Sequence, residues 1–424
     1  MSVPEAADAA ALLLRTLPPA VSALAARLRA AGHEAFLVGG CVRDALRGEP
    51  IRDFDLTTSA AAEAVLALFP RAVPTGLRHG TVTIPTEAGP VDVTTYRAGP
   101  SLEVDLAHRD FTVNAMAVDP RTGALIDPWE GRSDLAACLL RAVGSAADRL
   151  QEDPLRALRA ARLVATLGLA PDPALEVALP AAGERLGGVA RERIRAELEA
   201  LLCGTRAGDG LALLARTGIA QRLAPGVRED APAVVATLPR DLVLRLAAWL
   251  RGTRAAAILA ALRFPRRLAQ PVVLLMRLHP VEVGVEPASD TSVRRLLQRA
   301  GDENVVALIT LRRAELAAAD VSDSAGADTA SCESRDITAA ATRARLDALE
   351  AALVRVRAAG TLALHRFDLA LDGEAVMQAL GCGPGRVVGA ALRFLTERVL
   401  EDPACNTPEH LRTLLAEWEP PKGG

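Results

Sequence analysis

The feature that most constrains this fold is a change in hydrophobic pattern near residue 145. Before it, short apolar runs alternate with turn residues. From Pro154 almost to the end, alanine, leucine and arginine recur at helical spacing. Aromatic residues make up only 3% of the 424 residues, which favours helix packing over extensive sheet. We therefore expect an α+β N-terminal part, a small mixed sheet with helices, followed by an all-α remainder.

The local patterns predict individual elements. In the N-terminal part they predict helices over 19–32 and 41–46, strands over 34–39, 54–57, 81–85 and 91–96, and a helix or strand over 109–119. Residues 320–335 (DVSDSAGADTASCESR) are polar and low in bulk, so they predict a mobile linker. The last segment, about 336–418, is predicted to be helical with a break at 381–386 (GCGPGR).

Composition narrows the cellular setting. No run of about 18 uncharged apolar residues is present, so we expect no membrane span. The first ten residues, MSVPEAADAA, lack the basic region of a signal peptide. The six cysteines are scattered without a CxxC pair, which favours reduced thiols and a cytoplasmic protein over a zinc site or a disulfide framework.

Two aspartates one residue apart, Asp53 and Asp55, raise the first chemical question. In a strand they would share one face, about 7 Å apart at Cα, with Phe54 and Leu56 turned to the core. Adjacent carboxylates repel unless a cation lies between them, and Mg²⁺ is commonly held by one or two carboxylates together with substrate phosphates. Two metal ions could activate an attacking hydroxyl and stabilise a leaving pyrophosphate. The alternative is a pair of exposed turn acids.

The surroundings of the two aspartates favour a phosphate site. Gly39 and Gly40 stand where a predicted strand meets a helix, where backbone N–H groups can approach a phosphate. Arg43 follows one turn later and can reach the same phosphates. Asp92, in a predicted neighbouring strand, could join the metals or take the proton of the attacking hydroxyl. A solvent-facing strand acid remains the alternative for Asp92.

Arginine supplies nearly all of the positive charge. The formal net charge is −3, and Lys422 is the single lysine. From Arg240 to Arg299 there are eleven arginines against four acids. Such a local basic surface would suit a nucleic-acid partner, and a solvated helical face is the alternative.

Several motifs in a fixed order point to one family. They are VGGCVRD (38–44), DFDLTTSA (53–60), RDFTVNAMA (109–117), IDPWEGRSDL (126–135), EDPLRALRAAR (152–162) and RERIRAELEALL (191–202). Together with the segment 371–411 they resemble the class II tRNA nucleotidyltransferases and bacterial poly(A) polymerases of the polymerase-β superfamily. The resemblance implies a polymerase-β-like catalytic head (1–145), a nucleotide-selecting neck (146–205), a helical body ending in a flexible linker (206–335) and a tRNA-binding tail (336–424).

The resemblance also implies how a base is chosen without a template. Asp153 and Arg156 would sit three residues apart on one helix face, and the alternative is an ordinary intrahelical ion pair. A carboxylate beside a guanidinium complements the amino donor and ring acceptor of both CTP and ATP. GTP and UTP present the reverse order, which would cost about 1–3 kcal/mol per mismatch.

Further nucleotide contacts follow from the resemblance. It assigns Arg159 and Arg162 to the bound nucleotide, and Arg109 and Asp110 to the ribose, whose 2′-hydroxyl distinguishes NTP from dNTP. The family usually has Arg-Arg-Asp where this chain has His108-Arg109-Asp110.

The expected function is template-independent addition of C to the 3′ end of tRNA, with Mg²⁺ as cofactor and release of pyrophosphate. The expected catalytic residues are Asp53, Asp55 and Asp92. Asp53 and Asp55 are expected to bind the metal ions. Residues 75–84 (TGLRHGTVTI) resemble the tRNA enzymes more than the polyadenylating ones. In the family, a short loop like that at 98–104 goes with enzymes that add C and C and then stop. Full CCA addition, using ATP as well as CTP, is the first alternative. The others are a poly(A) polymerase and an inactive RNA-binding protein.

Overall fold

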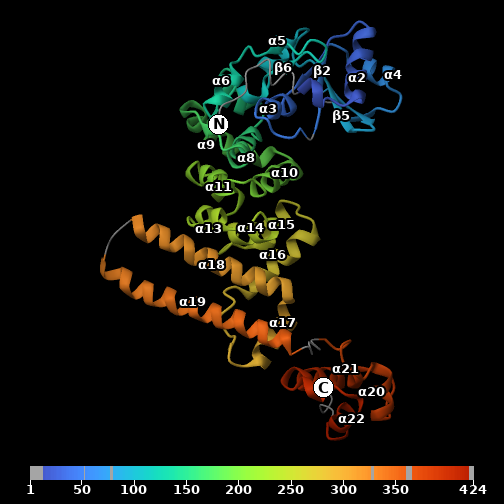
Figure 1. Cartoon of the computed structure of the whole chain (residues 1–424), viewed down its shortest axis with the longest axis vertical. Helices are drawn as coiled ribbons and strands as arrows, with labels where there is room; N and C mark the ends of the chain where they lie inside the picture. Colours follow the sequence, from blue (N-terminus) through green and yellow to red (C-terminus); the bar gives the residue numbers. More distant parts are fainter. Residues whose placement is uncertain (1–12, 52, 77–79, 326–328, 360–364, 420–424) are drawn as a thin grey trace. The chain divides into compact units, whose positions relative to one another are not determined.

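The computed structural model describes residues 13–51, 53–76, 80–325, 329–359 and 365–419. The first residues, part of 75–84 and the middle of the expected linker therefore lie outside the described residues. The chain divides into two compact units, 1–225 and 226–424 (Figure 1). Within the described residues, no helix is both long and apolar enough to cross a membrane.

The first unit begins with a mixed sheet, as its alternating pattern predicts. The strand order is β3-β4-β5-β2-β1-β6-β7, in which β2 and β5 are parallel neighbours and the other pairs are antiparallel. The strands are β1 (Ala35–Val38), β2 (Asp55–Thr58), β3 (Val73–Gly76), β4 (Thr81–Thr86), β5 (Gly89–Thr95), β6 (Ala117–Val118) and β7 (Leu125–Ile126). The helices of this part are α2 (Pro19–Ala30), α3 (Gly40–Leu46), α4 (Ala62–Leu68), α5 (Leu102–Ala107), the 3-10 turn η2 (Thr112–Asn114) and α6 (Gly131–Ala136).

Helices complete the first unit. They are α7 (Ala146–Glu152), α8 (Arg156–Leu167), α9 (Pro173–Arg185), η3 (Leu186–Gly188), α10 (Arg191–Leu202), α11 (Ala207–Arg216) and α12 (Ile219–Leu223), with a two-strand pair of β8 (Leu139–Leu140) and β9 (Ala170–Pro171). Helix α8 packs against both α10 and α11. A Cβ at Gly210 of α11 would lie 2.6 Å from the Ala161 carbonyl oxygen of α8, so this close approach requires glycine. Residues 206–225, expected to start the body, thus pack with the neck.

The second unit is helical throughout its described residues. Its helices are α13 (Ala231–Thr237), α14 (Leu242–Trp249), α15 (Ala255–Ala261), α16 (Arg266–Leu278), α17 (Asp290–Ala300), α18 (Asp302–Ala325), α19 (Thr329–Ala358), α20 (Gly373–Leu380), α21 (Arg386–Glu401), η4 (Pro403–Cys405) and α22 (Pro408–Ala416). A buried apolar cluster joins the last three α-helices, which break near 381–386 as predicted.

The prediction of a mobile linker over 320–335 is wrong for the described part. Helix α18 continues to Ala325 and α19 already begins at Thr329, so only 326–328 lie outside the description. The two helices run side by side (Figure 1), and ion pairs of Arg343 with Asp320 and of Arg313 with Asp347 join them. Alanine-rich sequence and these inter-helix pairs outweigh the low bulk of the segment.

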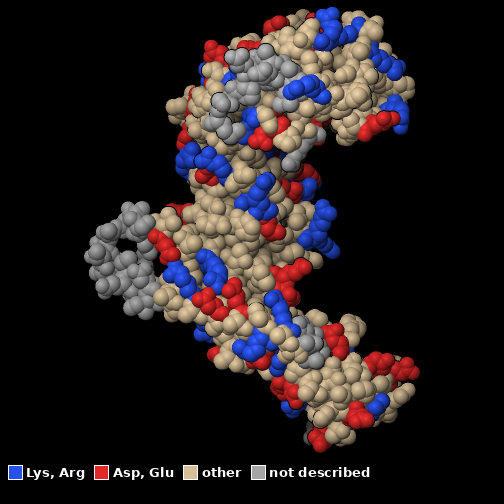
Figure 2. Space-filling view, in the orientation of Figure 1, with Lys and Arg blue, Asp and Glu red and all other residues tan. Residues whose placement is uncertain are grey.

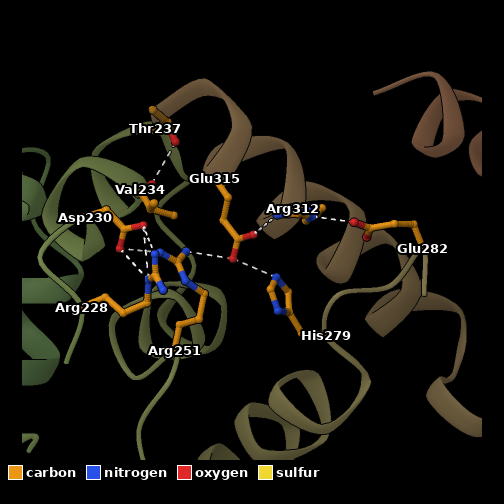
Figure 3. A network of polar contacts seen from close by, with 9 residues as sticks. All are labelled: Arg228, Asp230, Val234, Thr237, Arg251, His279, Glu282, Arg312 and Glu315. Atoms are coloured by element: carbon orange, nitrogen blue, oxygen red, sulfur yellow. Dashed lines mark hydrogen bonds and ion pairs between the residues drawn. The ribbon is translucent and has the colours of Figure 1, made fainter. Parts of the chain in front are cut away.

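Ion pairs also occupy much of the predicted basic stretch. Arg251 binds Glu315 and Asp230 inside the second unit, as Figure 3 shows. Arg294 donates to the Leu400 carbonyl, and Arg295 pairs with Glu397. Figure 2 shows arginines and acids interspersed on one face of the chain. The stretch is therefore not a uniform basic surface.

Four arginines of this stretch remain available. They are exposed, and their side chains have no hydrogen-bond or ion-pair partner within the described residues: Arg254, Arg266, Arg267 and Arg277. These four side chains, on α16 and just before α15, are the ones in this stretch that we expect to contact phosphates if the stretch binds nucleic acid.

Candidate functional site

The centre of the candidate site is a pair of acids on adjacent strands. Asp55 is the first residue of β2, and the parallel strand β5 places Asp92 directly beside it in register. Register partners project from the same face of the sheet, with the strands about 5 Å apart. Thr83 of β4 stands opposite Asp92 and donates a hydrogen bond of 2.5 Å to its carboxylate. The prediction that Asp55 and Asp92 lie on neighbouring strands is confirmed.

Asp53 lies just outside the strand. Strand β2 starts at Asp55, so the prediction that both acids belong to one strand is wrong in this detail. Phe54, expected in the core, is only partly buried, whereas Leu56 is fully buried. Burial raises the pKa of Asp55, and the negative charges of Asp92 and Asp53 raise it further. The three carboxylates therefore form a crowded negative centre.

A glycine turn faces this centre. Gly39 has φ 75° and ψ −130°, a conformation that residues with a Cβ rarely adopt. A Cβ there would lie 3.4 Å from a terminal nitrogen of Arg109 and 3.7 Å from Asp55 Oδ2. Gly40 then opens α3, and Arg43 projects from it. Lack of a side chain at Gly39 thus leaves backbone next to the acids and Arg109.

Buried carboxylates position the cations around the acids. Asp105 is fully buried and accepts hydrogen bonds from Thr57 Oγ1 (3.1 Å), Arg97 N (3.1 Å) and the Arg109 guanidinium (3.1 Å). These three partners lie in β2, just after β5, and just after α5. Asp105, which sequence reasoning missed, therefore ties Arg109 to the strands that carry Asp55 and Asp92.

Asp110 is a second buried carboxylate that holds a cation of the site, in this case Arg159. Burial alone would raise its pKa, but the Arg159 guanidinium 3.1 Å away and hydrogen bonds from Asn114 and Phe111 N bring the pKa below its usual value. Asn114 also accepts a 2.6 Å hydrogen bond from Arg43. A continuous polar chain thus links Arg43, Asn114, Asp110 and Arg159.

The predicted base-reading pair has a different geometry. Helix α7 ends at Glu152 and α8 begins at Arg156, so Asp153 lies between two helices, in extended backbone. The prediction that Asp153 and Arg156 lie on one helix is therefore wrong. Pro154 accounts for the break, because it lacks an N–H donor and disfavours the helical conformation of the residue before it. The Asp153 and Arg156 side chains pair with other groups of the described chain and not with each other. The alternative of an intrahelical ion pair is therefore excluded.

Each member of the pair has its own anchors. Arg156 donates to the carbonyls of Arg149 (2.8 Å) and His108 (3.1 Å), and pairs with Glu152 at 2.8 Å. His108 thus helps to hold Arg156 through its backbone carbonyl. This contact does not depend on the side chain, which is an arginine in most members of the family. Asp153 pairs at 2.8 Å with Arg193.

Helix α10 supplies partners that sequence reasoning did not assign. Arg193 binds Asp153, and Glu197, one turn later, pairs with Arg162 at 2.7 Å and lies 3.8 Å from Arg159. Both residues lie in the motif RERIRAELEALL, which was the available signal. All predicted site residues lie in the first unit, where contacts between residues up to 71 positions apart in sequence connect the elements that carry them.

Comparisons with known proteins agree with this arrangement. Residues 35–141 match the family described as the poly A polymerase head domain, and residues 168–230 match a probable RNA and SrmB-binding site of polymerase A. A crystal structure of the Bacillus stearothermophilus CCA-adding enzyme in complex with CTP is 29% identical, with a TM-score of 0.74, covering 93% of this chain and 96% of that one. The chain is similar to this family of nucleotidyltransferases and poly(A) polymerases both in its head domain and in its fold.

Members of this nucleotidyltransferase family with both product types are similar to the chain. The CCA-adding enzyme of Geobacillus thermodenitrificans is 41% identical over 213 residues, 47% of this chain and 52% of that protein. The CC-adding tRNA nucleotidyltransferase of Shouchella clausii is 44% identical over 201 residues, with the same two coverages. The chain thus matches about half the length of these curated relatives.

The family fold extends over nearly the whole chain. The Thermotoga maritima CCA-adding enzyme complexed with tRNA has a TM-score of 0.67 at 20% identity and covers 97% of this chain. The polymerase-β-like head followed by helices, predicted from the motifs, is confirmed.

Proposed function

We propose that this nucleotidyltransferase adds C nucleotides to the 3′ end of tRNA without a template and releases pyrophosphate. One observation carries the proposal: Asp55 and Asp92 stand in register on parallel strands, beside a glycine turn and the Arg109 guanidinium. Carboxylates of this kind suit proton abstraction and metal binding, and the glycine turn and cations suit a triphosphate. The similarity to CTP-bound and tRNA-bound enzymes supports these substrates.

The acids fit a divalent cation, and we propose Mg²⁺ on Asp53 and Asp55. Burial and the negative charges of Asp92 and Asp53 raise the pKa of Asp55 although Arg109 and Arg159 act against them, and a bound cation would favour the charged carboxylate further. Within the described residues no group of three or more His, Cys, Asp or Glu side chains can hold a metal ion, so triphosphate oxygens would supply further ligands. When bound, the cation would lower the pKa of the tRNA 3′-hydroxyl and stabilise negative charge on the pyrophosphate.

The chain's own groups would bind and orient the nucleotide. Arg43 and the backbone at Gly39 and Gly40 would hold the triphosphate, and Asp92 would accept the 3′-hydroxyl proton or join the metal. Arg109 and Asp110 would contact the ribose. The remaining contacts, to the base and the bound nucleotide, fall to Asp153, Arg156, Arg159 and Arg162.

We further propose that addition stops after two C nucleotides. Of the short segment 98–104, the last three residues already belong to α5, whose N-cap is Ser101. A Cβ at Gly99 would lie 2.8 Å from Val104 Cγ1, so the turn packs closely on the helix. This leaves little free chain to reshape the pocket for ATP. Mass spectrometry of tRNA products formed with CTP and ATP together tests this: products ending in CC support it, and products ending in CCA reject it.

The broader proposal is tested with single nucleotides. The purified protein is incubated with tRNA lacking its CCA end and with each labelled NTP separately. Incorporation of CTP and not of UTP or GTP is expected. Long A-tracts on unrelated RNA would instead establish poly(A) polymerase activity.

We propose the cytoplasm as the location of the protein. The cysteines of the described residues form no disulfide, which is consistent with this location: Cys41, Cys138, Cys203, Cys382 and Cys405.

A further inference from the structure

The base-reading aspartate is held by two separate bonds. Asp153 Oδ1 accepts a 3.0 Å hydrogen bond from Leu155 N, two residues along the chain. Its other oxygen, Oδ2, accepts a 2.8 Å bond from Arg193 on α10. One bond is local and comes from the turn between α7 and α8, whereas the other crosses to a different helix. Together they determine the orientation of the carboxylate plane.

The bond from Arg193 leaves room for a nucleotide. The Asp153 side chain is 28% exposed and the Arg193 side chain 50% exposed, so neither is enclosed. Two bonds occupy half of the roughly four lone-pair positions of a carboxylate. The carboxylate therefore keeps acceptor positions for a base amino group.

Among the described residues, the two other arginines near Asp153 are paired elsewhere: Arg159, whose charge interacts with Asp153, is paired with Asp110. The Arg156 guanidinium is bound to Glu152 and to the carbonyls of Arg149 and His108 instead of to the Asp153 carboxylate. Without Arg193, the carboxylate would retain only the backbone bond at Leu155 and could rotate about its side-chain torsions. Rotation would matter because discrimination depends on where the oxygen lies.

We propose that Arg193 is a specificity-positioning residue, which holds the Asp153 carboxylate in the orientation that accepts the amino group of cytosine. This inference rests on the proposed function. UTP and GTP place a carbonyl oxygen where CTP places its amino group, so a fixed carboxylate oxygen repels them. A carboxylate that turns away relieves this repulsion and loses the bond to the cytosine amino group.

The test compares the ratio of kcat/KM for CTP to that for UTP on tRNA lacking its CCA end. Arg193→Met should lower this ratio about tenfold, the low end of the effect of losing a hydrogen bond to a charged group. Arg193→Lys should lower the ratio less than Arg193→Met does, because an ammonium group can still donate one hydrogen bond to Asp153. The matched control is Arg195→Met, which removes a cation of the same helix that pairs with Glu199. It should leave the ratio unchanged.

A double variant separates positioning from RNA binding. If Arg193 acts through Asp153, the Arg193→Met change should not alter the ratio further in an Asp153→Ala background. An unchanged ratio in active Arg193→Met, an equal loss in Arg195→Met, or an additive loss in the double variant would each overturn the inference. Arg193→Gln serves as a second neutral variant if Arg193→Met does not fold. Wild-type protein that incorporates no CTP would refute the proposed function itself, a result distinct from all of these.

Discussion

Replacement of Glu315 by glutamine should destabilise the second unit by about 3 kcal/mol. The Glu315 side chain is 9% exposed and contacts two arginines and a histidine, as Figure 3 shows: Arg251 at 2.8 Å, Arg312 at 2.7 Å and His279 at 2.8 Å. Glutamine preserves the shape but removes the charge. The arginines would then depend on Asp230 and Glu282 alone.

The magnitude follows from the lowered pKa. Burial by itself would raise the pKa of Glu315, but His279 and the arginines outweigh it and lower the pKa from 4.5 to about 2. A pKa lowered by about 2.5 corresponds to about 3 kcal/mol of stabilisation of the charged form. This agrees with the roughly 3–5 kcal/mol by which removal of one partner destabilises a buried ion pair.

The pH dependence gives an independent check. Because the folded pKa is below the unfolded value, the stabilisation is complete above about pH 5 and disappears as the pH falls towards about 2. The difference in unfolding free energy between wild type and Glu315→Gln should therefore be constant near neutrality and shrink in acid. Other carboxylates affect both proteins and cancel in the difference.

Urea unfolding is the assay, followed by the fluorescence of buried Trp249 in α14, with Trp129 and Trp418 replaced by phenylalanine. The control is Glu350→Gln, which removes an exposed partner of Arg313 and should cost less than about 1 kcal/mol. A loss of stability for Glu315→Gln no larger than that of the control, or one that does not shrink in acid, would refute the reasoning.

Three further predictions concern the reaction. Asp53→Ala should abolish incorporation of CTP while nearly preserving tRNA binding in a filter assay, and a rate above a few per cent of wild type would contradict the metal assignment. Asp153→Ala should slow CTP addition and relax discrimination against UTP and GTP in single-nucleotide kinetics, whereas unchanged selectivity would exclude it as the base reader. Neutral replacement of Arg266, Arg267 and Arg277 should weaken tRNA binding and lower the log–log salt slope by about 0.7–0.9 for each phosphate that an arginine no longer neutralises. An unchanged affinity and slope would make them a solvated face.

The sequence predicted those parts of the site that depend on local pattern. Alternating strands placed Asp55 and Asp92 on neighbouring strands, and the glycines marked the turn beside them. The pattern did not show that Pro154 separates Asp153 from α8, although the proline itself was a usable signal.

Pairs between distant elements could not be predicted in the same way. Arg193 binds Asp153 across 40 residues, and Asp105 joins groups that meet only once the sheet and α5 have packed. Similarly, the composition of 320–335 suggested a linker because inter-helix ion pairs such as that of Asp320 with Arg343 are invisible in the local sequence.

The most direct test of the central claim is the mass of the tRNA 3′ end after reaction with all four NTPs at equal concentration. The starting tRNA ends before its CCA sequence, and the purified protein is supplied with Mg²⁺. The expected product is longer by cytidines alone, with no uridine or guanosine. An unchanged mass, a mixture of all four nucleotides or a long run of adenosines would contradict it.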